Sequence, residues 1–146
     1  MSAHVRPAHR AGPRRWALLP AAVLVLALSG LAAGCSSKPA YCTDASQLKT
    51  DVQNLGNVDV AKNGLGSLQT ALSKVQADAK TFAADAKSAF PSQTTALDTA
   101  LSGLQTAITS AKGQPAVTAA TAVATSVVQV KNSASNLQNA ISGSCQ

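Results

Sequence analysis

The chain has 146 residues, of which 46% are hydrophobic, 3% aromatic and 12% charged, and its formal net charge is +6. The apolar content is mostly alanine, valine and leucine, which favours helices that pack through small side chains. All four arginines precede residue 35, and the rest of the chain has eight lysines, six aspartates and no Arg, Glu, His or Trp. Interspersed lysine and aspartate without arginine does not make a nucleic-acid surface, so we expect no nucleic-acid partner.

The N-terminal segment has the pattern of a signal peptide. Residues 1–15 are basic and residues 16–33 are almost wholly apolar. Positive charge that stays on the cytoplasmic side, followed by an apolar segment, is typical of export signals. About 18 apolar residues can also just span a bilayer, so a permanent anchor is the alternative. The small residues from Ser29 to Gly34 favour removal of the segment.

A short motif at the end of this segment resembles the lipobox of bacterial lipoproteins. It consists of Leu31, Ala32, Ala33, Gly34 and Cys35. In that family, small residues let the peptide bond enter a membrane-embedded peptidase, and the cysteine thiol accepts a diacylglyceryl group. The resemblance implies cleavage before Cys35 and a lipid anchor, with palmitate among its acyl chains, at the extracytoplasmic face of the cell membrane. Two acyl chains anchor a protein stably. An ordinary cleaved signal without lipid is the second possibility.

The two other cysteines of the chain can pair with each other. If Cys35 carries lipid, Cys42 and Cys145 remain as an even pair in an oxidising compartment. We predict a disulfide between them; two free thiols or an intermolecular bridge are the alternatives. No metal site is expected, because two cysteines 103 positions apart, with no His or Glu after residue 35, do not complete a usual zinc ligand set.

Three segments follow from these features. Residues 1–34 are the predicted signal peptide, and residues 35–41 are a predicted tether, whose serines, lysine and proline suit an extended linker. Residues 42–146 are the predicted helical domain.

Apolar residues at spacings of three and four predict four helices in that domain. The predicted helices cover about residues 43–55, 61 or 65–89, 93–112 and 116–142. Their apolar seams are, in order, Ala45, Leu48, Val52 and Leu55; Leu65, Leu68, Leu72, Val75, Ala79, Phe82, Ala86 and Ala89; Leu97, Leu101, Leu104, Ile108 and Ala111; and Ala116, Ala120, Val123, Val127, Val130, Ala134, Leu137 and Ile141.

Local signals mark the ends of these helices. Thr43 or Asp44 can cap the first helix, and Gly56 ends it. Pro91 ends the second and Gly113 closes the third. Valine and threonine make a strand conceivable in parts of the fourth segment, but its sustained heptad spacing favours a helix.

The cysteine pair also bears on the number of helices. An even number of antiparallel helices returns the chain to its starting end, whereas three would separate Cys42 from Cys145 by a helix length of about 30 Å. We therefore predict an all-α, up-down antiparallel four-helix bundle whose ends are joined by a disulfide.

No catalytic residue or cofactor site is predicted. Bundle enzymes use inward carboxylates and histidines, and this chain has no histidine after residue 9 and no glutamate. Asp78 and Asp85 lie seven residues apart on the second helix. They suggest a calcium or cationic-ligand stripe, but we interpret them as a solvated helix face. Phe82 lies on the seam and is predicted to pack in the core.

The mature segment, residues 35–146, resembles the small alanine- and threonine-rich helical lipoproteins and secreted proteins of high-GC Gram-positive bacteria (actinobacteria), with a cysteine near each end. The resemblance implies an envelope location and supplies no activity. The expected function is that of a non-enzymatic membrane-anchored envelope lipoprotein that acts through an unidentified envelope protein partner or as a structural element. The alternative is a carrier that binds an apolar ligand between its helices, at residues that the sequence does not identify. A filled core favours the former, and a cavity of a few hundred Å³ the latter.

Overall fold

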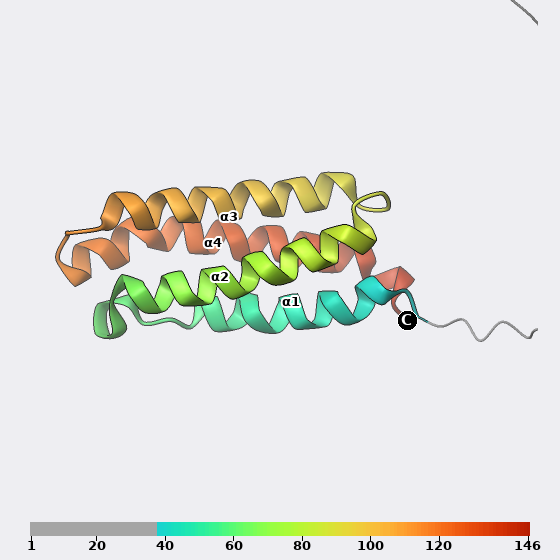
Figure 1. Cartoon of the computed structure of the whole chain (residues 1–146), viewed down its shortest axis with the longest axis horizontal. Coiled ribbons are helices and arrows are strands. Elements are labelled where there is room, and N and C mark those ends of the chain that lie inside the picture. Colours follow the sequence, from blue (N-terminus) through green and yellow to red (C-terminus); the bar gives the residue numbers. More distant parts are fainter. Residues whose placement is uncertain (1–37) are drawn as a thin grey trace, which may run out of the picture. The chain divides into compact units, whose positions relative to one another are not determined.

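Four α-helices, α1 to α4, make up most of residues 38–146, the part of the chain that the computed structural model describes (Figure 1). They span Ala40–Gly56, Val60–Ala86, Pro91–Ala111 and Ala116–Ile141, and a short 3₁₀ turn, η1 (Ser142–Ser144), follows the last. Since none of these residues forms a strand, the helical prediction for the fourth segment is confirmed. The predicted signal peptide and Cys35 lie outside the described residues.

Helix α1 begins earlier than predicted. Its first turn forms after Pro39, whose carbonyl accepts a hydrogen bond from the amide of Cys42 at 2.9 Å. Proline suits a helix start because its fixed φ is close to the helical value and the first amides have no partner within the helix. Thr43 and Asp44 therefore do not cap this helix, and the last two residues of the predicted tether belong to α1.

Helix α2 is capped and kinked by its own residues. The side chain of Asp59 accepts a hydrogen bond from the amide of Lys62 at 3.1 Å. Gly64 has a φ of 74°, a left-handed conformation that strains other residues, and it joins two helical segments. The helix ends at Ala86, three residues before the predicted end. Pro91 was predicted to end it and is instead the first residue of α3, where a missing amide costs little.

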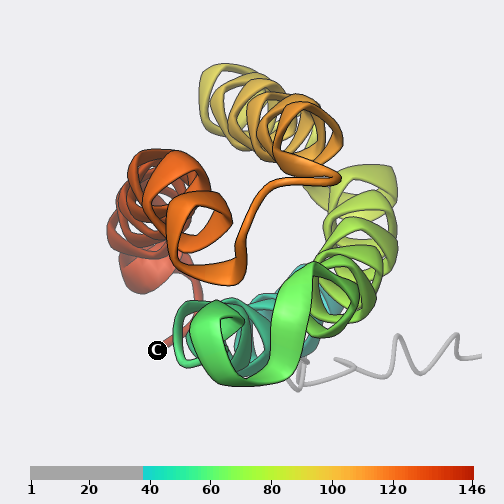
Figure 2. The ribbon, with the colours of Figure 1, turned by 90° about the vertical axis from the view of Figure 1, so that its left-hand side faces the viewer.

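The helices alternate in direction round a common centre, with α1 and α3 at opposite corners (Figure 2). Helices α2 and α4 each pack against both of these and also contact one another, and the most extensive packing joins α3 to α4. Because the chain traverses the bundle four times, its two ends meet. There Cys42 and Cys145 form a disulfide, with 5.6 Å between their Cα atoms. The predicted all-α four-helix bundle with joined ends is confirmed.

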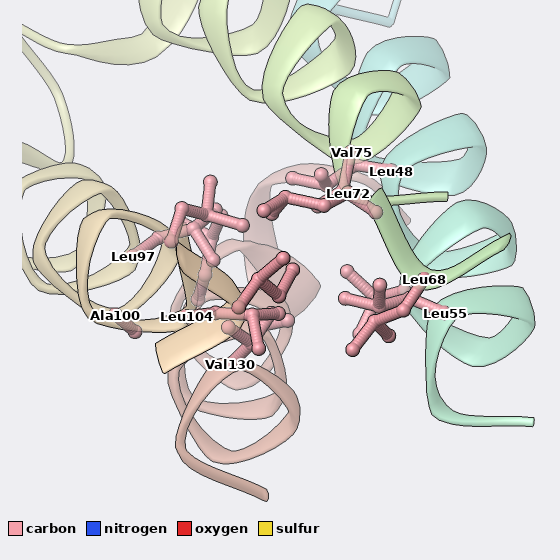
Figure 3. Packing of buried hydrophobic residues seen from close by; sticks show 14 of the residues in the cluster. Leu48, Leu55, Leu68, Leu72, Val75, Leu97, Ala100, Leu104 and Val130 are labelled. Carbon is pink, nitrogen blue, oxygen red and sulfur yellow. The ribbon is translucent and has the colours of Figure 1, made fainter. Parts of the chain in front are cut away.

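The four seams meet in one apolar core between the helices (Figure 3). Burial of each large side chain contributes on the order of 1.5 to 3 kcal/mol, so the core supplies the main favourable term in folding. The largest fully buried side chains are Phe82, Leu48, Leu55, Leu68, Leu72, Leu97, Leu104, Ile108, Leu137, Val75, Val123 and Val130.

Two predicted seam residues lie outside this core. Ala89 follows the end of α2, so it leaves the helical phase and is exposed. Ala116 lies in the first turn of α4, where Ala119 is buried in its place.

Candidate functional site

The disulfide end of the bundle carries the three aromatic residues of the described chain. The ring of Tyr41 lies edge-on to Phe82, with 6.3 Å between centroids, and to Phe90 at 5.6 Å. Phe82 is fully buried, as predicted, while Tyr41 and Phe90 are half-buried and cover this end of the core. With both thiols oxidised, this end offers packing and a covalent tie rather than a nucleophile.

The prediction that Asp78 lies on a solvated face is wrong. Its Oδ2 atom is buried and has no hydrogen-bond partner. Burial, a side-chain hydrogen bond with Asp51, and the negative charges of Asp51 and Asp44 together raise the pKa of Asp78 from its ordinary value of 3.8 to about 6. Asp85, in contrast, is exposed as predicted.

Two side-chain amides of α1 hold the carboxyl group of Asp51 in place. Asp51 accepts hydrogen bonds from the amide groups of Gln47 at 3.5 Å and Asn54 at 3.4 Å. The carboxyl group of Asp78 on α2 therefore lies beside that of Asp51 on α1, and this neighbour disfavours the ionised form of Asp78. No group of three metal-ligating side chains occurs within residues 38–146.

A weak signal for this contact was present in the sequence. Asp78 follows Val75 by three residues and precedes Phe82 by four, so it lies at the edge of the α2 seam. Asp51 lies between Leu48 and Leu55 in the same manner. Such edge positions become buried only if a neighbouring helix covers that edge, which the sequence does not reveal.

One groove of about 380 Å³ lies between α2 and α3. Lys80, Lys87 and Asp98 at its rim are exposed. Phe82 and Leu97 form part of its lining and are 0% and 2% exposed, respectively. The groove is therefore a surface depression, because solvent does not pass between these side chains into the core.

A second groove, of about 370 Å³, lies at the opposite end of the bundle from the disulfide. We call it the distal groove. Val58 lines it from the connection between α1 and α2, Val60 from the first turn of α2, and Val127 and Val128 from α4, and the charged residues Asp59 and Lys131 also lie in its lining. Val127 belongs to the predicted seam of the fourth helix, whereas Val58, Ala124 and Val128 lie outside the predicted seams.

Comparison of the chain with protein-family models, with curated proteins and with solved structures found no match. None of the helices in residues 38–146 is both long enough and apolar enough to cross a membrane.

Proposed function

We propose that the protein is a non-enzymatic envelope lipoprotein, anchored to the cell membrane through Cys35, whose helical domain acts through protein interaction or as a structural element. The observation that carries this proposal is the Leu31–Cys35 motif, which resembles a lipobox and lies five residues before α1. Five residues span at most about 17 Å, so the anchor would hold the disulfide end of the bundle close to the bilayer.

This geometry leaves the other end of the bundle for partners. The chain reaches that end at the connection between α1 and α2 and again at the connection between α3 and α4 (Figure 1). The distal groove lies there. In the anchored protein, the apolar surface that is available to other envelope proteins would therefore face away from the membrane.

The chemistry of the described side chains supports an interaction role over an enzymatic one. Residues 38–146 contain no histidine, arginine or glutamate. Several exposed threonine hydroxyls donate to the carbonyl four residues earlier in their own helix, as in Thr99 to Thr95 at 2.9 Å and Thr109 to Gln105 at 2.9 Å. A hydroxyl held in this way, without a neighbouring base, is not an activated nucleophile.

The carrier alternative has less support. A carrier buries most of its ligand in a cavity, whereas the groove between α2 and α3 has Phe82 and Leu97 in its lining, and both side chains are already shielded from solvent. The helices would have to separate to admit an apolar ligand. Organic extraction of the protein purified from its own membranes, followed by mass spectrometry, tests this directly. A stoichiometric extracted lipid would favour the carrier.

Radiolabelled palmitate or glycerol incorporation tests the anchor. The wild-type protein should incorporate label and begin at Cys35, and Cys35→Ala should abolish both labelling and signal removal. Cys42→Ala is the matched control, because it removes a thiol from the same region and should leave labelling unchanged. Normal processing and membrane retention of the Cys35→Ala protein would rule out the lipoprotein proposal.

A further inference from the structure

The connection between α1 and the long part of α2 contains a helical turn that is held together by its own residues. We call residues 57–64 the strap; they lie at the end of the bundle opposite the disulfide (Figure 1). The carbonyl of Asp59 accepts a hydrogen bond from the amide of Asn63 at 2.8 Å, and its side chain accepts one from the amide of Lys62 at 3.1 Å. The ammonium group of Lys62 lies 3.6 Å from the carboxylate of Asp59. These contacts lie within the strap, so the turn can move as a unit without losing them.

Two valine side chains attach this turn to the bundle. Val60 is buried, and Val58 is half-buried and packs against the core. The side chains of Asp59, Ala61 and Lys62 are exposed. Lifting the turn therefore costs chiefly the burial of these two valines, which is a small part of the apolar area that the whole core buries.

The glycines beside the two ends of the strap differ in their surroundings. Gly64 joins the turn to the rest of α2 with a φ of 74°, and a Cβ atom added there would meet no other part of the described chain within 4 Å. At Gly56, in contrast, Cδ of Lys131 lies 3.0 Å from the position of an added Cβ, so the lysine stem packs on the end of α1. Gly64 is therefore the freer pivot, and a glycine tolerates large changes of φ and ψ.

The strap lies over residues of the core. Leu55 on α1, Leu68 on α2 and Val123 on α4 line the distal groove together with Val60, and all three are fully buried. We propose that the strap is a hinged cover of the distal groove. It swings outward about Gly64, withdraws Val60 from the core and uncovers these three side chains. The proposal does not depend on the lipid anchor, because it concerns the other end of the bundle.

The movement changes the distal groove while the rest of the bundle stays packed. The disulfide ties the opposite end of the chain, and the seam residues beyond the groove, such as Val130, keep their contacts. A local opening of this kind costs less free energy than global unfolding. The groove deepens into the core without separation of the long helices, so the apolar surface at this end depends on the position of the strap.

Thiol labelling of the full-length protein in mild detergent tests the cover. Val123→Cys places a thiol beneath the strap, and Val130→Cys is the matched control, because it lies two turns further along the same seam, is buried and is outside the groove lining. Under non-reducing conditions, maleimide labelling located by peptide mass spectrometry should be about tenfold or more faster for Val123→Cys, since local opening suffices to expose it. Circular dichroism checks that both variants keep their helices. Equal labelling rates at the two positions would overturn the proposal.

Loosening the strap gives the second measurement. Val60→Ala removes two buried methyl groups and should speed the labelling of Val123→Cys by about tenfold, while the labelling of Val130→Cys stays unchanged. Val117→Ala is the control, because this valine is exposed and outside the groove lining, and it should change neither rate. If Val60→Ala accelerates both positions equally, exposure occurs by global unfolding and the hinged cover is wrong. If it accelerates neither, Val60 does not hold the cover closed and the proposal is also wrong.

Discussion

The two helical hairpins of the bundle pack through similar inner faces but have different outer surfaces. The first hairpin, α1 and α2, carries most of the charged residues, whereas after Pro91 the chain has only Asp98, Lys112 and Lys131. Both hairpins contribute fully buried leucines to one core. The inner faces are therefore alike, and the difference between the hairpins lies on and near their surfaces.

Each surface has its own consequence. In the first hairpin, a charged residue at the edge of the seam leaves a buried carboxylate oxygen of Asp78 without a partner. In the second hairpin, Val117 and Val128 of α4 are exposed to solvent, because no helix of the bundle covers them. A charged residue at a buried edge lowers the stability of the folded protein. An uncharged face with exposed apolar side chains favours association with other molecules.

The largest predicted effect tests whether the two hairpins share one core. Leu72→Asp in α2 and Leu104→Asp in α3 each place an unpaired charge at a side chain that is 0% exposed. Each should cost more than about 4 kcal/mol and should unfold a domain of ordinary stability, about 5 to 10 kcal/mol. Chemical denaturation followed by circular dichroism measures this.

The surface substitution Asp85→Ala is the control for this pair and should change the free energy of unfolding by less than about 0.5 kcal/mol. If either leucine variant keeps a cooperative transition with half of the helical signal, the hairpins fold independently and the single core is wrong.

The buried face of each helix was predictable because the spacing of its apolar residues repeats. Spacings of three and four along Leu97, Leu101, Leu104 and Ile108 define a buried face in a single helix, before any neighbour is known. The cysteine pair then limited the topology to an even number of helices.

Features that depend on a neighbour were not predictable in this way. The burial of Asp78 arises because α1 covers the edge of α2. The start of α1 was missed because no side chain caps it, and Pro39 leaves no polar signal. The exposure of Val117 and Val128 was not predicted, because valine and alanine occur on both faces of α4 and the regular spacing marks only the inward face.

The second predicted effect concerns the covalent tie between the hairpins. The Cys42–Cys145 bridge joins residues 103 positions apart, the first near the start of α1 and the second just after α4. In the chain-entropy model such a bridge contributes about 4 to 5 kcal/mol by restricting the unfolded chain. Reduction should therefore lower the melting temperature substantially and leave the helical circular dichroism intact at low temperature, because the seams hold the fold. Loss of the helical signal on reduction alone would mean that the second hairpin depends on the first for its structure.

The smallest predicted effect isolates the charged edge of the first hairpin. The pKa of Asp78 is raised in the folded protein to about 6, so the folded state binds this proton more tightly than the unfolded chain, whose value is near 3.8. The resulting stabilisation is complete below pH 3.8 and is lost as the pH rises through 6, which makes ionised Asp78 destabilising at neutral pH. The full shift corresponds to about 3 kcal/mol, and access of solvent to the pair reduces this to about 1 to 2 kcal/mol.

Asp78→Asn keeps a polar group that can donate to Asp51 without a charge. It should therefore raise the free energy of unfolding by about 1 to 2 kcal/mol at pH 7.5 and have little effect at pH 4. The same substitution at the exposed Asp85 should show no such pH dependence, and denaturation curves of both variants at the two pH values make the comparison. Equal behaviour of the two variants would mean that the edge of α2 is as solvated as its outer face, and the contrast between the hairpins would then rest on the exposed valines of α4 alone.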